Sequence, residues 1–402
     1  MNPGDRFISQ YFRALKPRAP GSASRAHLLD LARSMKDVIS LNSGDPDLTA
    51  APIAVEAAVE ALRAGKTHYA HGGLPELRAA IGRKCEAENG FSIDPDRQLI
   101  ITNGSAEAAA ALFLTLLDPG DEVLTTDPYY SGHVSAITTA RGSPVLVPTR
   151  GEDLWEPDPA EVERRITART KAFIFATPGN PTAAVYSRET LQALLDIAHK
   201  HNILIIPDEL FERYVYDGHR HVSLASLPGA EDRVVTINGF SKSYCMTGWR
   251  LGWMAVPLWL AGTLAEVRYS LSMTASTANM WGAIAALSVA ARPYYDEVYC
   301  TYGERRAFFY DAFTRMGLPQ KPTAGAFVGM VDIRKTGRSE AEVAESFLTE
   351  ARVLIWPATV FGGCGQGYLR VSLIKPLATL REMVRRVEPV VAGMLATVTR
   401  ST

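Results

Sequence analysis

Hydrophobic and polar positions follow a regular order of short apolar runs and longer amphipathic segments. Runs such as LIIT at 99–102, FIFA at 173–176 and ILII at 203–206 are apolar throughout, which is typical of strands covered on both faces. Helix-patterned segments separate the first five strands, so the pattern predicts an α/β fold with a mainly parallel sheet between helices. Ligands of such sheets bind beyond the carboxyl ends of the strands. Seven strands are predicted, at 98–102, 122–126, 144–148, 171–177, 203–207, 233–238 and 251–256.

The chain of 402 residues is long enough for two domains. Helix-patterned segments at 257–291 and 293–316 lead to a smaller C-terminal unit. Residues 1 to about 30 mix Arg, Pro, Gly and Ser, and this composition predicts an arm rather than a core element. We therefore expect an arm with part of a small domain at 1–45, a large domain at 46–292 and a small domain at 293–402.

Composition excludes several classes of protein. A net charge of −1 gives no reason to expect a nucleic acid or an anionic membrane as partner. The four cysteines show no metal-ligand spacing, and His219 and His221 are expected to be solvated or capping, so no metal site is predicted. The uncharged run 273–291 is too rich in Ala, Ser, Thr and Asn for a membrane span and predicts a buried or interface helix. With no signal peptide evident, we expect a cytoplasmic protein.

Candidate chemistry concentrates between the last two predicted strands. Lys242 lies in a loop with Phe240, Tyr244, Met246 and Trp249 as neighbours. An ammonium with so few polar neighbours loses hydration, its pKa falls, and the neutral amine can form a Schiff base with a carbonyl. The alternative is a surface lysine on a connecting loop. If Lys242 is considered without the surrounding motif, this alternative is favoured.

The surrounding string S-K-x-Y-x-M-T-G-W-R-L-G resembles the signature of class I/II aminotransferases, the fold-type I enzymes related to aspartate aminotransferase that use pyridoxal 5′-phosphate (PLP). The resemblance extends over nearly the whole chain. It implies a large domain with a seven-stranded sheet, a smaller α/β domain and a homodimer with active sites shared between subunits. It also implies that Lys242 carries PLP as a Schiff base, that Ser241 contacts PLP, and that Arg250 binds its phosphate, which a planar guanidinium fits.

Further cofactor contacts follow from the resemblance. Gly104, Ser105 and Ala106 begin a helix after the first strand, where free backbone N–H groups suit a phosphate. An ordinary capped helix start is the alternative. Tyr130 is expected to stack on the pyridine ring, although Tyr129 remains possible.

The turn P-G-N-P-T-A resembles N-P-T-G of the family, which implies that Asn180 donates a hydrogen bond to the 3′ oxygen of PLP. Ala183 replaces the family's glycine, so the turn must keep φ negative there or carry strain. Asp208, in D-E-L-F, would keep the pyridine nitrogen protonated so that the ring withdraws electrons. Phe211 replaces a tyrosine at the cofactor, and the lost hydrogen bond is worth about 1 kcal/mol.

Substrate contacts are implied for three residues. Gly44 lies in L-N-S-G-D-P-D, where the family's glycine lets the backbone approach the substrate carboxylate, and an unliganded turn glycine is the alternative. Asn180 is expected to contact the substrate as well as the cofactor. Arg370, in F-G-x-x-G-x-x-x-x-R-x-S, would bind the α-carboxylate through two parallel hydrogen bonds. Tyr69 is implied to reach the phosphate in the neighbouring subunit, with a core or surface tyrosine as the alternative.

The resemblance therefore implies a PLP-dependent aminotransferase that acts on an α-amino acid and a keto acid. A PLP-dependent lyase or decarboxylating enzyme is the second reading, for which Phe211 and Ala183 are the only hints. A non-catalytic PLP or amino-acid sensor is the third, and the presence of Lys242, Asp208 and Arg370 speaks against it. No cation aligns with a site for a side-chain carboxylate, and Arg25 in the predicted arm is the candidate considered for that role.

Overall fold

The computed structural model describes residues 9, 11 and 22–401, and a seven-stranded sheet forms the centre of its larger part. The strand order is β2-β8-β7-β6-β5-β3-β4, and only β8 runs antiparallel to its neighbours. The prediction of a mainly parallel sheet is confirmed, and each predicted strand is present with its ends displaced by three residues or fewer. The strands are β2 (Leu99–Thr102), β3 (Glu122–Asp127), β4 (Ser143–Pro148), β5 (Thr170–Ala176), β6 (Leu204–Asp208), β7 (Thr236–Gly239) and β8 (Gly252–Ala255).

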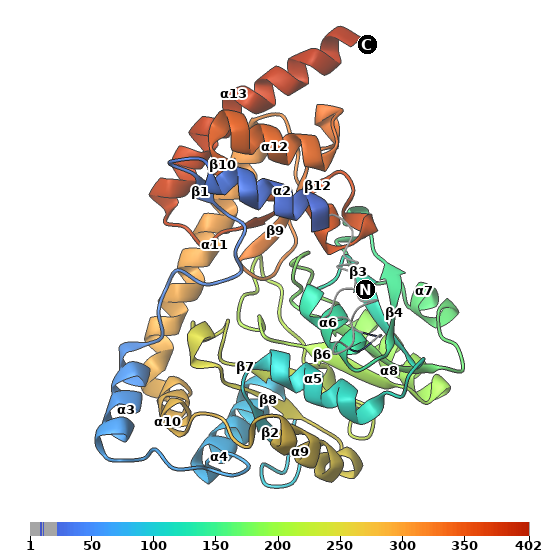
Figure 1. Ribbon diagram of the computed structural model, residues 1–402, viewed down its shortest axis with the longest axis vertical. Coiled ribbons are helices and arrows are strands. Elements are labelled where there is room, and N and C mark those ends of the chain that lie inside the picture. Colours follow the sequence, from blue (N-terminus) through green and yellow to red (C-terminus); the bar gives the residue numbers. More distant parts are fainter. Residues whose placement is uncertain (1–8, 10, 12–21, 402) are drawn as a thin grey trace.

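Helices cover both faces of this sheet (Figure 1). Consecutive residues of β5 show this, because Ile174 belongs to one core cluster while Phe173 and Phe175 belong to another. The first cluster includes side chains of α5 (Ser105–Leu116), α6 (Ser131–Thr139) and α9 (Leu258–Ser272). The second includes side chains of α7 (Pro159–Arg164) and α8 (Arg188–His201). Burial on both faces explains why these strands are apolar throughout.

Three helices pack beside β2 and β8 at the lower end of the molecule in Figure 1. They are α3 (Pro52–Arg63), α4 (Pro75–Lys84) and α10 (Thr277–Ala286). The run at 273–291 thus contains a helix with Met280 and Ala283 fully buried, as predicted. No helix among the described residues has both the length and the apolar character needed to cross a membrane.

A smaller unit is built from both ends of the chain (top of Figure 1). Its sheet has the order β11-β12-β9, and β1 pairs with β10 beside it. Residues 22–30, predicted as part of an arm, begin the helix α2, which buries Leu28 in this unit's core. The remaining elements are β1 (Ile39–Ser40), β9 (Val328–Asp332), β10 (Val353–Leu354), β11 (Trp356–Pro357), β12 (Tyr368–Ser372), α2 (Ser22–Arg33), α12 (Glu340–Ala351) and α13 (Leu377–Ser401).

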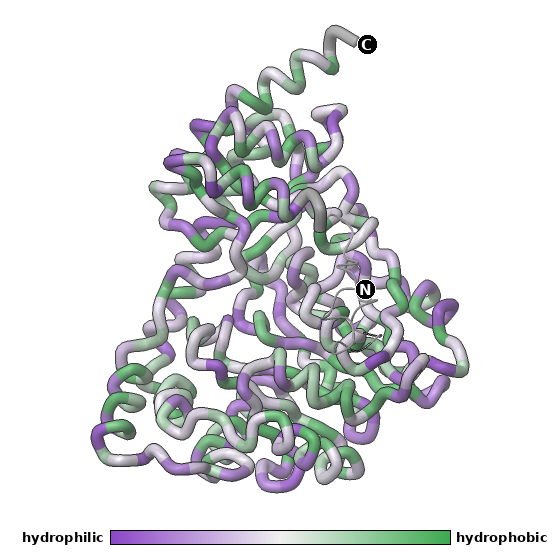
Figure 2. Tube along the Cα trace, in the orientation of Figure 1, coloured by the Kyte–Doolittle hydropathy of each residue, from purple (hydrophilic) through white to green (hydrophobic). Residues whose placement is uncertain are grey.

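The long helix α11 (Arg292–Arg315) joins the two parts. Val298 and Tyr302 near its start pack in the core of the large sheet, whereas Phe309 and Phe313 pack in the core of the smaller unit. In Figure 2 the helices of the smaller unit change repeatedly between hydrophilic and hydrophobic along their length. That pattern is expected of helices with one face on a core and the other toward solvent.

The turn after β5 holds Ala183 in a left-handed conformation. Its φ is +57°, its side chain is buried, and its N–H donates to Gly179 O at 2.7 Å. Of the two possibilities left open by the sequence, strain is therefore the one realised. A left-handed conformation costs a residue with a Cβ roughly 1–2 kcal/mol.

We predict that Ala183→Gly is less destabilising than Ala184→Gly by roughly 1–2 kcal/mol, because only the first substitution relieves left-handed strain. Ala184 is the matched control, since it is equally buried and its φ is not positive. Urea unfolding of the two variants measures the difference. Equal shifts of the unfolding midpoint would contradict the interpretation.

Candidate active site

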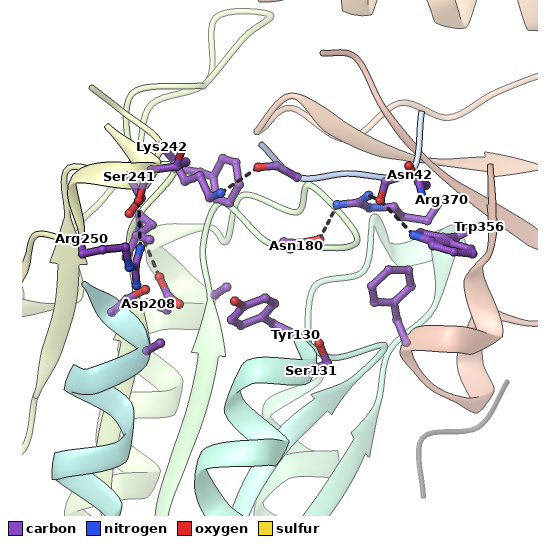
Figure 3. Close-up of a pocket in the computed structure, with 18 of the residues that line it drawn as sticks. Asn42, Tyr130, Ser131, Asn180, Asp208, Ser241, Lys242, Arg250, Trp356 and Arg370 are labelled. Atoms are coloured by element: carbon purple, nitrogen blue, oxygen red, sulfur yellow. Dashed lines mark hydrogen bonds between the residues drawn. The ribbon is translucent and has the colours of Figure 1, made fainter. Parts of the chain in front are cut away.

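A cavity of about 320 Å³ lies between the carboxyl ends of the parallel strands and the smaller unit. Figure 3 shows Asp208, Ser241 and Arg250 at one end, Trp356 and Arg370 at the other, and Tyr130 between them. Most predicted site residues line this cavity. Those residues are Gly44, Ser105, Ala106, Tyr130, Asn180, Asp208, Phe211, Ser241, Lys242, Arg250 and Arg370.

Lys242 follows β7 and extends its amine into the cavity. Its Nζ donates a hydrogen bond to Gly44 O at 2.7 Å. Burial lowers the pKa of Lys242 to about 8, an effect that Asp45 opposes and Arg370 reinforces. A much larger fraction of this amine is therefore neutral near pH 8 than for an exposed lysine. The structure therefore gives Lys242 the desolvated environment that its apolar neighbours in the sequence predict.

Asp208 ends β6 and is fixed in the cavity wall by two contacts. Its Oδ2 lies 3.0 Å from His133 Nε2, and its Oδ1 accepts a hydrogen bond from Leu210 N at 3.2 Å. His133 lies in the first turn of α6 and is buried. Sequence reasoning missed this histidine, although its position three residues after Tyr130 would have placed it on the same side of a helix.

Aromatic side chains form the middle of the cavity wall. Tyr130 lines the cavity and contacts the His133 ring edge-on at a centroid distance of 5.1 Å. Tyr129, which the sequence left as an alternative, is buried outside the cavity lining. Phe211 also lines the cavity and packs edge-on against Phe327. The wall beside Asp208 is therefore apolar and suited to a flat ring.

The start of α5 and Arg250 form a cradle that fits a phosphate. Gly104 is the N-cap, with φ of +84° and no side chain to cap the helix. A Cβ at Gly104 would lie 2.6 Å from Arg250 Nη2, so a side chain at this position would displace the guanidinium. Among the described residues, Arg250 donates only to carbonyl oxygens, Thr247 O and Asn103 O, and has no carboxylate within ion-pair distance. An uncapped helix N-terminus beside an unpaired guanidinium is a site for an anion.

Arg370 occupies the other end of the cavity. It lies on β12, is buried, and donates to Asn42 O at 3.0 Å and to Asn180 Oδ1 at 3.2 Å. No carboxylate of the described residues pairs with it. Burial, followed by the charge of Arg25, lowers the pKa of Arg370 to about 9, so it remains cationic at neutral pH. A buried cation of this kind requires an anionic ligand for full compensation.

Tyr69 lies outside the cavity. Its side chain is 67 % exposed on the loop before α4, where its ring contacts His71. The structure therefore does not bring it to the site of its own chain, and its predicted role toward a second subunit stays a prediction.

Known proteins resemble the chain over most of its length. The family of class I and II aminotransferases matches residues 36–387. The chain belongs to this family. It is 36 % identical to an aspartate aminotransferase of Pyrococcus abyssi over 90 % of this chain and 94 % of that protein. It is equally identical, with the same coverage, to aromatic-amino-acid aminotransferase 2 of Thermococcus litoralis. A solved aspartate aminotransferase of Thermus thermophilus, a single mutant, superposes with a TM-score of 0.88 at 35 % identity, covering 95 % and 99 % of the two chains. The chain is thus an aminotransferase of fold type I, and this family is generally PLP-dependent.

A buried polar network lies behind Asp208 in this aminotransferase and was not foreseen. Lys84 Nζ donates to Glu212 and to Asn89 Oδ1, and Asn238 of β7 donates to the other oxygen of Glu212 at 3.0 Å. Burial is the largest single influence and would raise the pKa of Glu212, but the charge of Lys84, that of His221 and the hydrogen bonds from Lys84 and Asn89 together outweigh it and lower the pKa to about 2. No local sequence pattern could reveal this network, because its residues come from segments that are distant in the sequence.

The expectation for His221 was wrong. Its side chain is 9 % exposed, and its Nε2 lies 3.3 Å from Glu209 Oε2, so it is neither solvated nor a helix cap. The segment that follows His221 is held against Glu209, whose Oε1 accepts hydrogen bonds from Ser223 Oγ and Leu224 N at 3.1 Å, and composition does not reveal this contact. Glu209, Glu212 and His221 carry potential metal ligands within 4.8 Å of one another. Lys84, Asn89 and Asn238 already occupy both oxygens of Glu212, so this carboxylate is not free for an ion.

We predict that the Lys242 amine of the cofactor-free aminotransferase titrates near pH 8. Its acylation rate should rise as pH rises through this value and then level off, because only the neutral amine reacts. Mass spectrometry of peptides labelled at increasing pH measures the midpoint, with the other lysines as internal reference.

The variant Asp45→Asn supplies the control for this titration. Asp45 opposes the lowering of the Lys242 pKa, so its neutralisation should move the midpoint to still lower pH. A wild-type midpoint near pH 10, or an upward shift in Asp45→Asn, would contradict the electrostatic interpretation.

Proposed function

We propose that this aminotransferase binds PLP through Lys242 and exchanges the amino group of an α-amino acid with a keto acid. A single observation carries the proposal. One cavity holds a desolvated amine, a fixed carboxylate and two arginines for which the described residues provide no carboxylate partner. These groups suit an aldehyde, a ring nitrogen, a phosphate and an α-carboxylate respectively. The names of the relatives, which are aspartate and aromatic-amino-acid aminotransferases, agree with an amino-acid substrate.

The chain's own residues would hold PLP at one end of the cavity. Gly104, Ser105 and Ala106 at the start of α5, with Ser241 and Arg250, would bind its phosphate. Tyr130 would stack on the ring, and Asn180 would donate to the 3′ oxygen. Asp208 would keep a proton at the ring nitrogen, and His133 orients that carboxylate. When bound, PLP supplies an electron-withdrawing ring that delocalises the negative charge left at Cα of the substrate.

The remaining residues would bind the substrate and move its proton. Arg370 would hold the α-carboxylate together with Asn180, and the backbone of Gly44 lies beside both Arg370 and Lys242. A carboxylate held there would place Cα on the side of the cavity where Gly44 contacts Lys242. A pKa near 8 suits Lys242 as the base that takes the proton from Cα, since the ideal catalytic pKa lies near the operating pH.

We also propose a homodimer with shared sites, in which Tyr69 of one subunit contacts the phosphate in the other. Its 67 % exposure in the isolated chain leaves the ring available for such a contact.

We retain the predicted division into 1–45, 46–292 and 293–402, because the core of the smaller unit takes its residues from positions 28–41 and 309–394. A cytoplasmic location likewise stays part of the proposal.

The function is tested by mixing the PLP-loaded protein with amino acids. Transamination predicts that an amino acid removes the absorbance of the bound aldehyde and that a keto acid restores it. A lyase would release ammonia with a keto acid in one step, and a decarboxylating enzyme would release carbon dioxide. Absence of any spectral change with all twenty amino acids would contradict the proposal. Lys242→Ala is the control that cannot form the coloured adduct.

Phe211→Tyr is predicted to lower the pH midpoint of the holoenzyme's visible absorbance by somewhat under one unit. The added hydroxyl can donate to the 3′ oxygen of PLP and stabilise its less protonated form by about 1 kcal/mol. Phe361→Tyr adds the same hydroxyl at the far end of the cavity, beside Arg370, and should leave the midpoint in place. A pH titration of both variants measures this, and an unchanged midpoint in Phe211→Tyr would refute the contact.

A further inference from the structure

The cavity contains one permanent cation to which the proposed function gives no ligand. Its lining includes three arginines, one lysine and a single carboxylate, that of Asp208. In the proposed function Arg250 binds the phosphate, Lys242 the aldehyde and Arg370 the α-carboxylate. Arg25 lines the same cavity and remains unassigned.

The core of the smaller unit fixes the position of Arg25. The helix α2 packs against α12 and the turn Ala358–Phe361, with Leu28 buried. Arg25 lies one helical turn before Leu28 and therefore on the same side of α2. Its Cζ lies 5.3 Å from the centroid of the Trp356 ring, and Trp356 Nε1 donates to Asn42 O at 2.9 Å. The guanidinium thus rests on a ring that is itself fixed in place.

Arg25 also lies close to Arg370. The two share the Asn42 region of the wall, because Asn42 O accepts from both Arg370 Nη1 and the indole under Arg25. Their mutual repulsion contributes to the lowered pKa of Arg370. No acidic residue of the described chain lies within ion-pair distance of either arginine. By contrast, Arg305, which is buried as Arg370 is, is paired with Asp47 at 2.7 Å. Two neighbouring guanidinium groups without a carboxylate form a site for a ligand with two anionic groups.

We propose that Arg25 binds a second carboxylate on the substrate side chain, so that the preferred substrates are dicarboxylic amino acids and their keto acids. The inference rests on the proposed function for the role of Arg370. Arg25 is then a specificity-determining residue, and its planar fork suits a carboxylate. The rival role of Arg25 is a cation–π contact with an aromatic side chain of the substrate.

The first test measures binding without turnover. Succinate and butyrate have the same number of carbons, but only succinate carries two carboxylates, and neither has an amine. Calorimetry on the PLP-loaded protein should show tighter binding of succinate. In Arg25→Gln the ratio of succinate to butyrate affinity should fall roughly ten- to hundred-fold. An unchanged ratio would overturn the proposal.

Two further variants separate charge from folding. Arg25→Lys keeps the charge and should recover part of the ratio. Arg33→Gln removes a cation from the same helix that is exposed and paired only with Asp30, so it should keep the wild-type ratio. If Arg25→Gln merely disturbed α2, affinity for both acids would fall together and the ratio would not change, which would count against the proposal.

The second test uses turnover. The ratio of kcat/KM for aspartate to that for asparagine, and for glutamate to that for glutamine, should fall in Arg25→Gln by a similar factor. If amino acids are turned over but neither ratio depends on Arg25, or aromatic substrates lose most, the inference fails while the proposed function stands. If nothing is turned over but succinate binding depends on Arg25, the proposed function fails while the two-carboxylate site stands.

Discussion

Removal of the Lys242 amine from water is the constraint on which the rest of the site depends. Phe240, Tyr244 and Met246 of its loop are buried in the core beside β2 and β8, so the lysine cannot turn toward solvent. Within the part of the chain that the structure describes, Nζ donates one hydrogen bond, to Gly44 O, in the segment that leaves the smaller unit. The position of the amine therefore requires both parts of the molecule. A charged group buried with so little compensation shifts its pKa, which gives a neutral nucleophile without a dedicated base.

Close backbone packing places the anion cradle beside this amine. Gly239 pairs with Gly252 across β7 and β8, and a Cβ on Gly239 would lie 2.9 Å from Gly252 Cα. A Cβ on Gly252 would in turn lie 2.9 Å from Gly104 C. Three glycines therefore let the beginning of β8 approach the start of α5. Because β8 begins two residues after Arg250, this approach sets the guanidinium against the helix N-terminus.

Cations of this chain occur in two different settings. Lys84 with Glu212 and Arg305 with Asp47 are buried cations with carboxylate partners, and their role is to fix the packing of segments distant in sequence. At the cavity, Arg25, Arg250 and Arg370 lack carboxylate partners within the described residues, and only Asp208 opposes them. These three cations line the cavity that a ligand would enter.

The sequence by itself determined the sheet and the main chemical groups. The apolar runs located all seven strands, because a strand buried on both faces is apolar at successive positions. The motifs around Lys242, Asp208 and Arg370 identified side chains that the fold brings together in one cavity. Only the tertiary structure decided the contact of His133 with Asp208, the Lys84–Glu212 network, the burial of His221 and the place of Arg25 on Trp356. Local spacing encodes which face of an element is buried, whereas these contacts join segments up to 331 positions apart, and their geometry exists only once the layers have packed.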